Sequence, residues 1–178
     1  INGDIEMFDY MRSNGADKLS ELKLQEALNL AIENSQEVSA LLIINWGGSD
    51  VTSHIDKVSH ETFLHKAAFK GLPRVCGALL ETNPSISIDA KTKDKSTALH
   101  FAVASGSLET VEFLINKGAS TRIKNSHKNT AKALAIMYNY QEIIKCLEVG
   151  KRSNFSTDPS SNMDPLAPQS SSRISRID

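Results

Sequence analysis

The stretch TALHFAVASG, residues 97–106, decides the fold of this chain, because the stretch TFLHKAAFKG at residues 62–71 repeats its pattern. The two stretches agree at Thr, Leu, His, Ala and Gly, and their threonines lie 35 residues apart. A weaker version, TAKALAIMYN, begins at Thr130, 33 residues after Thr97. A pattern that returns at this interval indicates a chain of similar structural units.

The segments that follow these stretches also align. SLETVEFLINKGAS follows Gly106, LPRVCGALLETNPS follows Gly71, and YQEIIKCLEVG begins at Tyr140. Upstream, DIEMFDYMRSNGAD at residues 4–17 matches the segment after Gly106, and a looser copy covers residues 27–51. This self-similarity predicts a solenoid, in which each unit buries its apolar faces only by stacking on its neighbours.

The clearest copy predicts a pair of short helices. Thr97 stands where an N-cap hydroxyl is needed, and Gly106 stands where a helix ends in the left-handed conformation. An apolar stripe lies between them, and a second stripe follows before Gly118. The stripe positions are Leu99, Ala102 and Val103 in the first helix and Leu108, Val111, Leu114 and Ile115 in the second.

These motifs resemble those of the ankyrin-repeat family over about residues 1–150, most specifically at Thr62–His65 and Thr97–His100. The resemblance implies an all-α ankyrin-repeat solenoid of about four and a half helix-turn-helix repeats with short loop fingers. The expected array is residues 1–152, with repeats at about residues 1–20 (partial), 21–56, 57–92, 93–125 and 126–150. In this family the histidine of the Thr-x-Leu-His turn hydrogen-bonds to backbone between repeats. The implied structural residues of the repeat turn are Thr62, His65, Gly71, Thr97, His100 and Gly106.

Two copies depart from the pattern. Copy five has Lys132 and Ala133 in place of Leu and His, and Asn139 in place of Gly, so we expect it to be a C-terminal cap. Copy two lacks the Thr and the His, and its helix ends should be the least regular of the array. Its segment NWGGSD is interpreted as a loop. The ring of Trp46 in that loop either covers the edge of copy two or three, which we favour, or is an exposed anchor for a partner.

Two segments are expected to be non-helical. The connection between copies three and four contains SISID, residues 85–89, whose alternation predicts a short extended strand or a finger. Residues 153–178 are rich in Ser, Pro and Asp and are expected to form a disordered tail or linker.

Composition limits the kinds of partner and the cellular compartment that we expect for this chain. The net charge of −1 lacks the basic excess that duplex nucleic acid requires. No apolar run is long enough to span a bilayer, so membrane insertion is not expected. Cys76 and Cys146 are too few for a disulfide framework and fit a reducing compartment, the cytoplasm or the nucleus. The start at Ile1, within a repeat, indicates a fragment from which targeting signals can be missing.

No motif points to catalysis, a cofactor or a metal. NWGGSD lacks the Lys-Ser/Thr and the preceding strand of a phosphate-binding loop. Neither zinc-ligand spacing nor a nucleophile elbow occurs. His54, His60, His65 and Cys76 could converge in principle, but His65 is assigned to the repeat turn and the other two histidines fall in loops. We therefore expect no catalytic, cofactor-binding or metal site.

The resemblance implies a non-catalytic, monomeric module that binds a partner protein through its concave surface and loop fingers. The alternative is a targeting or regulatory segment of a larger enzyme or ion channel whose catalytic part lies outside this chain. Phe69 and Phe101 either anchor the partner or pack between helices, and both alternatives stay open. Lys66, Lys70 and Lys95 would favour an acidic partner. The expected partner-binding residues are His60, Glu61, Lys66, Phe69, Lys70, Asp94, Lys95, Phe101, Ser105, His127 and Lys128.

Overall fold

Four helical hairpins make up the part of the protein that the structure, a computed structural model, describes, residues 21–153. The predicted partial repeat at residues 1–20 and residues 154–178 of the predicted tail lie outside the described residues. Residues 21–153 contain no β-strand, only an isolated bridge between Ile55 and Thr62. The helices are α2 (Glu21–Glu33), α3 (Glu37–Thr52), α4 (Phe63–Phe69), α5 (Pro73–Thr82), α6 (Ala98–Ala104), α7 (Leu108–Asn116), α8 (Ala131–Met137) and α9 (Gln141–Ser153).

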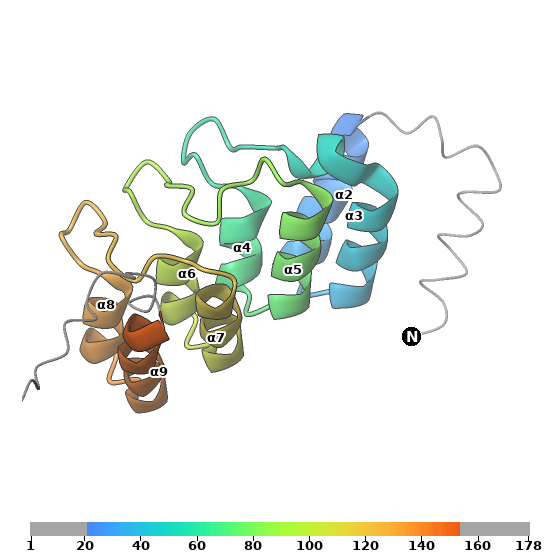
Figure 1. The fold of residues 1–178 in the computed structure, drawn as a ribbon. Coiled ribbons are helices and arrows are strands. Elements are labelled where there is room, and N and C mark those ends of the chain that lie inside the picture. The colour runs from blue at the N-terminus through green and yellow to red at the C-terminus, as the bar shows by residue number, and fades with distance from the viewer. Residues whose placement is uncertain (1–20, 154–178) are drawn as a thin grey trace, which may run out of the picture.

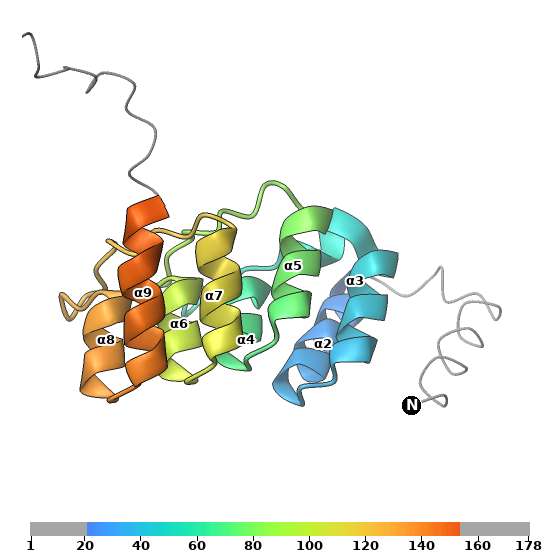
Figure 2. The same cartoon turned by 60° about the horizontal axis from the view of Figure 1, so that its bottom comes forward.

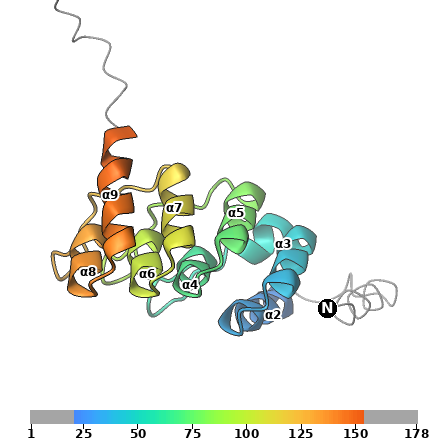
Figure 3. The same ribbon diagram turned by 90° about the horizontal axis from the view of Figure 1, so that it is seen from below.

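The helices stand in two rows (Figure 1). The first helices of the hairpins, α2, α4, α6 and α8, lie side by side in one row, and α3, α5, α7 and α9 form the other (Figures 2 and 3). The connections between hairpins all leave the array on the same side (Figure 1). We call them the first finger (residues 54–62), the second finger (84–97) and the third finger (118–130). The prediction of an all-α solenoid of helix-turn-helix units is confirmed for the described residues.

The seams between hairpins are filled by aliphatic side chains. Leu64 of α4 and Leu99 of α6 have no exposed surface, and neither do the small residues Ala67, Ala68 and Ala102 beside them. Small side chains let the first-row helices approach closely, and each buried leucine contributes roughly 1.5–3 kcal/mol of burial free energy. A single hairpin leaves these faces in water, which is why the copies must stack.

The helix ends follow the repeated sequence. Thr62 and Thr97 precede α4 and α6 with extended backbone, at φ −99° and −107°, as N-cap residues do. Gly71 and Gly106 take φ values of +70° and +74° just after those helices. Only glycine adopts this conformation without a steric penalty, so the first helices of these two copies stop there.

The histidine of the turn links each of the two clearest copies to the finger that follows. His65 Nε2 lies 3.0 Å from the Ala90 carbonyl oxygen, and His100 Nε2 lies 3.1 Å from that of Asn129. A carbonyl oxygen only accepts, so Nε2 carries the proton and Nδ1 of His100 accepts from the Thr97 N–H at 3.2 Å. Burial lowers the pKa of both histidines below 6.5, which favours this neutral form.

Copy two is irregular, as its weak pattern predicts. Gly48 interrupts α3 with φ 61° and ψ −152°, so this helix is kinked. The assignment of NWGGSD to a loop was wrong, because Trp46 lies inside α3, where it is half-buried. In SISID the structure has turns and no strand, so this segment is a finger, with Ile86 and Ile88 partly buried against the core.

Candidate protein-binding surface

The expected partner-binding residues all lie on α4, on α6 or on the fingers. The first-row helices and the fingers form a continuous side of the array, which we call the inner surface (Figure 1). Five of the eleven expected residues come together around one pocket of the inner surface, and the other six lie on the fingers or at the end of α6. The five are Glu61, Lys66, Phe69, Lys70 and Phe101.

This pocket, the aromatic pocket, has a volume of about 330 Å³ and takes Glu33 of α2 as its sixth lining residue. The Phe69 and Phe101 rings meet across it edge to face, with centroids 6.3 Å apart and an interplanar angle of 86°. Phe69 lies on α4 and Phe101 on α6, which belong to neighbouring copies. The two rings meet because these helices pack side by side. An edge-to-face pair is a favourable arrangement of aromatic rings and holds both in defined positions.

The sequence left open whether the two phenylalanines pack between helices or contact a partner, and in the structure their environments differ. Phe101 is half-buried, packs against the core, and meets the His65 ring edge to face at 5.4 Å. Phe69 is 50% exposed, so about half of this large apolar side chain is in contact with solvent. Phe101 therefore supports the pocket from the core side, and Phe69 offers apolar surface to solvent.

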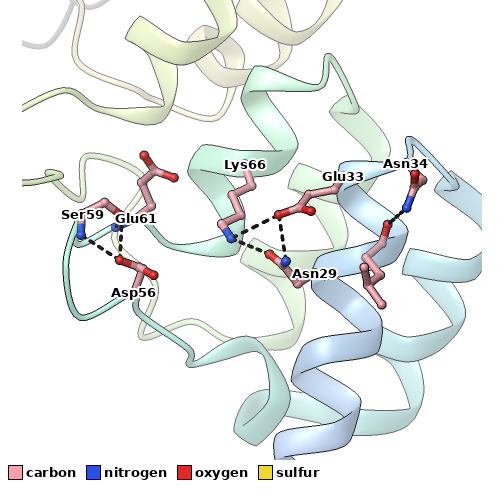
Figure 4. Close-up of polar contacts among 8 residues, drawn as sticks. Asn29, Glu33, Asn34, Asp56, Ser59, Glu61 and Lys66 are labelled. Atoms are coloured by element: carbon pink, nitrogen blue, oxygen red, sulfur yellow. Dashed lines mark hydrogen bonds and ion pairs between the residues drawn. The ribbon is translucent and has the colours of Figure 1, made fainter.

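Lys66 is already engaged by neighbours on α2 (Figure 4). Its Nζ donates to Asn29 Oδ1 and lies 3.8 Å from Glu33 Oε1. Asn29 Nδ2 also donates to Glu33 at 2.8 Å, so the three side chains form a closed group that links copies two and three. This arrangement makes Lys66 a less available cation than its sequence position suggests.

Lys70 and Glu61 form the charged rim of the aromatic pocket. Neither makes an ion pair with any residue in the described range 21–153. Lys70 is exposed and follows α4 directly, while Glu61 is half-buried and belongs to the first finger. The pocket thus combines an apolar floor with one cation and one anion that remain open to a ligand.

Asp94 closes the turn of the second finger. Its carboxylate accepts hydrogen bonds from the Thr92 hydroxyl and, at 2.8 Å, from the Ser96 hydroxyl. Partial burial acts to raise the pKa of Asp94, but these hydrogen bonds outweigh it and the pKa is lowered. The carboxylate is therefore occupied by its own finger.

Three expected residues occupy equivalent tips of the fingers. His60, Lys95 and Lys128 are exposed and take φ values of 60°, 63° and 62°. His127 is exposed beside Lys128. Ser105 differs from these, because its hydroxyl donates to the Ala102 carbonyl at 2.9 Å at the end of α6 and so serves the helix.

A second pocket, which the sequence did not predict, lies next to the first. This leucine pocket has a volume of about 400 Å³ and shares Lys66 with the aromatic pocket. Leu22 and Leu30 of α2 line it with 61% and 57% of their surface exposed. Two leucines eight positions apart on a helix are a detectable signal, but copy two lacks the motif that would have placed them. The other lining residues are Gln25, Glu26, Asn29, His54, Asp56 and Phe63.

The described residues provide neither a metal-binding cluster nor a membrane-spanning helix. In the described range no three His, Cys, Asp or Glu side chains are grouped so that they could hold a metal ion. His54 packs on the Phe63 ring at 5.6 Å, and His65 is committed to Ala90. None of the helices between residues 21 and 153 has the length and apolar character required to cross a bilayer.

Stacked helical hairpins with fingers on one side define a helical repeat protein. Residues 64–155, more than half of the chain, match the family of ankyrin repeats in three copies, and the chain belongs to this family.

Relatives share only part of their length with this chain. It is 37% identical over 87 residues to palmitoyltransferase ZDHHC13 of Mus musculus, covering 48% of this chain and 14% of that protein. It is 34% identical over 79 residues to E3 ubiquitin-protein ligase XB3 of Oryza sativa subsp. japonica, covering 44% and 17%. It is 30% identical over 90 residues to NAD-capped RNA hydrolase NUDT12 of Homo sapiens, covering 51% and 19%. The chain thus spans less than a fifth of each of these proteins.

Proposed function

We propose that this chain is a non-catalytic interaction module that binds a partner protein on its inner surface, with the aromatic pocket at the centre. The observation that carries the proposal is that Phe69 lines the aromatic pocket half-exposed, with its ring held edge to face against that of Phe101. Large aromatic side chains fixed in pockets supply much of the energy of protein interfaces. Membership of the ankyrin-repeat family supports the same class of function.

The surrounding residues would have different roles in such a complex. Phe69 and Phe101 would contact an apolar side chain of the partner. Lys70 and Glu61 would set its orientation, since unpaired charges at a rim contribute more to specificity than to affinity. Lys66, Asp94 and Ser105 would hold the surface in shape through the contacts described above. The finger tips would extend the contact beyond the pocket, and these are His60, Lys95, His127 and Lys128.

The array needs little rearrangement to bind. Backbone hydrogen bonds join the first finger to the second, from Lys93 N to Ser59 O at 2.8 Å, and the second to the third, from Ser126 N to Asp94 O at 2.7 Å. A surface that is ordered before binding loses less conformational entropy when a partner docks. We propose that the domain acts as a monomer in the cytoplasm or nucleus, where Cys76 and Cys146 would stay reduced.

The second candidate is that this array is the binding segment of a larger enzyme. The match to relatives that are themselves named as enzymes favours it, because each of them is several times longer than the matched region. The complete open reading frame separates the two candidates. A catalytic domain in the same reading frame would support the second, and a frame containing only repeats and linkers would support the first.

Affinity capture from the source cell's lysate, read by mass spectrometry, tests the binding surface. The bait is the chain itself, compared with Phe69→Ala/Phe101→Ala. The matched control is Val38→Ala/Val149→Ala, which removes two exposed apolar side chains from the second-row helices. Circular dichroism first establishes that all three proteins fold. A partner that the parent and the control retain, and the phenylalanine variant loses, would support the proposal; a partner retained by all three would place the binding surface elsewhere.

A further inference from the structure

The second and third fingers concentrate positive charge on a chain that is nearly neutral. Together they contain six Lys or Arg residues and two Asp residues, whereas the net charge of the whole chain is −1. All six basic side chains are exposed, and none makes an ion pair with a residue in the described range. The six are Lys91, Lys93, Lys95, Arg122, Lys124 and Lys128.

Contacts within the fingers already use the two carboxylates. Asp94 accepts from the hydroxyls of Thr92 and Ser96. Asp89 accepts from the Ser120 N–H at 2.9 Å and thereby ties the second finger to the third. These bonds hold the anions in place beside the backbone, while the long cationic side chains extend into solvent. The outer surface of the two fingers is therefore positive.

The turn geometry does not require lysine at these tips. Lys95 and Lys128 occupy the left-handed conformation, at φ 63° and 62°, which Gly and Asn adopt more readily. His60 has the same conformation in the first finger. Local backbone preference therefore does not explain why the equivalent residue is basic in three successive fingers, whereas a common ligand of negative charge does.

We propose that the second and third fingers bind an acidic protein segment, rich in Asp and Glu, whose neighbouring apolar side chain enters the aromatic pocket. This inference rests on the proposed function and names the chemistry of the partner. The two sites adjoin, because Glu61 lines the pocket while Ser59 of the same finger bonds to Lys93 of the second finger.

A protein segment fits this surface better than a nucleic acid does. In the aromatic pocket two glutamates balance Lys66 and Lys70, and in the leucine pocket Glu26 and Asp56 outnumber Lys66, so the positive charge of the fingers does not continue along the inner surface for a phosphate backbone to follow. A peptide can confine its acidic residues to the fingers and present an uncharged side chain to the pocket. The partner would consequently bind in one direction, with its acidic part toward α6 and α8.

Fluorescence anisotropy tests this inference with a labelled peptide that has alternating Glu and Gly on one side of a central Phe and alternating Ser and Gly on the other side. The finger variant is Lys93→Glu/Lys95→Glu/Lys128→Glu. The matched control is Lys23→Glu/Arg74→Glu/Lys145→Glu, which changes the net charge equally on exposed helical positions. We expect the finger variant to bind at least about tenfold more weakly, since three exposed cations that attract the acidic peptide are replaced by anions, although each exposed pair alone contributes little. The control should bind like the parent, and added salt should weaken parental binding.

Two results would overturn the inference. One is an equal loss of affinity in the finger variant and the control, which would show that the net charge of the protein, and not the position of the lysines, determines binding. The other is tighter binding of single-stranded oligothymidylate, or of phosphatidylserine vesicles, than of the peptide, which would assign the fingers to a nucleic acid or a membrane surface.

The same probes separate this inference from the proposed function. A peptide with Gly in place of the central Phe should bind the parent more weakly, and this difference should vanish in Phe69→Ala/Phe101→Ala. If lysate capture depends on the phenylalanines but the finger variant binds the acidic peptide as tightly as the parent, the inference fails and the proposed function stands. If the acidic peptide needs the fingers but no captured protein needs the phenylalanines, the pocket proposal fails and only the anion-binding part of the inference remains.

Discussion

Replacing His100 with Ala tests the link between the last two copies. The ring of His100 is buried, with 2% of the residue exposed, and connects three polar groups. Its Nε2 donates to the Asn129 carbonyl at 3.1 Å, and its Nδ1 lies 3.2 Å from the Thr97 backbone nitrogen and 2.9 Å from the Thr97 hydroxyl oxygen. The substitution removes the ring from all three, but the Asn129 carbonyl keeps its hydrogen bond from Asn125 N at 3.0 Å.

The cost follows from how well each group can be satisfied again. The Asn129 carbonyl still accepts from Asn125 N, and the Thr97 hydroxyl can rotate to another acceptor. The Thr97 N–H cannot move, and an unpaired buried donor costs about 1–3 kcal/mol. Loss of the packed ring adds roughly 1 kcal/mol. We therefore expect His100→Ala to lower the free energy of unfolding by about 2–4 kcal/mol.

Urea unfolding at about pH 7.5, followed by circular dichroism, measures this change. The control is His127→Ala, an exposed fingertip residue whose loss should alter stability by less than about 0.5 kcal/mol. A His100→Ala variant as stable as the parent, or a control destabilised equally, would refute the assigned role of the turn histidine.

The pH dependence gives a second readout of the same bonds. Burial lowers the pKa of His65 and His100 below 6.5, so below this pH the unfolded chain binds protons that the folded chain does not. Stability is therefore full above pH 6.5 and falls as the pH drops toward the folded pKa values, by up to about 1.4 kcal/mol per pH unit for each histidine. The His100→Ala variant should lose less stability on acidification than the parent. An unchanged slope would contradict the neutral Nε2–H form.

Three further predictions concern other positions. Leu99→Ala should lower the free energy of unfolding by roughly 2–5 kcal/mol because it hollows the seam, whereas an unchanged urea midpoint would contradict the packing. Gly106→Ala should cost about 1–2 kcal/mol, because its φ is +74° and the new Cβ would lie 3.2 Å from Tyr140; a neutral effect in the same urea assay would show that the turn is not strained. Burial raises the pKa of the Cys76 thiol to about 12. Iodoacetamide at about pH 8 should therefore label half-buried Cys146 but not Cys76 until urea unfolds the chain. Peptide mass mapping that finds Cys76 labelled in the folded protein would contradict its burial.

The fold was predictable wherever one residue had a single structural task. Thr97 caps a helix, His100 joins two copies and Gly106 ends a helix with positive φ, and none of these tasks tolerates many residue types. The same three residue types recur 35 residues earlier, which made the repeat visible without alignment. The apolar stripe then fixed which side of each helix is buried, because the 3.6-residue period admits one solution.

The errors fell in copy two, where those constraints are absent. Trp46 beside two glycines has the composition of a loop, yet tertiary packing of α3 on α2 and α5 keeps the segment helical up to Gly48. Intrinsic propensity is a weak guide when neighbours can override it. The SISID segment between copies three and four was predicted to be a short strand or a finger, and it is a finger, with no partner strand beside it in the described residues.

The candidate site was predictable in outline only. Sequence position placed Phe69 and Phe101 on first helices of adjacent copies, which is enough to expect proximity. It could not show that Lys66 is engaged by Asn29 and Glu33, because those partners come from the copy that lacks the motif. Side-chain pairing between copies depends on the stacking geometry, which one sequence does not specify.

The three fingers separate what the fold requires from what it leaves free. One side chain in each finger closes its turn: Asp56 accepts from Ser59 N at 2.7 Å, Asp94 from the Ser96 hydroxyl, and Asn125 from Asn129 N at 3.0 Å. Because an uncharged Asn does the same task as two Asp residues, the turn needs an acceptor and not a negative charge.

The tip residues show the opposite pattern, since their charge serves no contact within the array. Lys95 sits at φ 63°, a conformation that Asn tolerates better than Lys. Lys95→Asn should therefore leave the free energy of unfolding unchanged or raise it by a few tenths of a kcal/mol. It should also weaken the binding of the acidic peptide measurably in the anisotropy assay. A destabilised Lys95→Asn variant would show instead that the lysine holds the finger together, and the positive charge of the tips would then need a structural explanation.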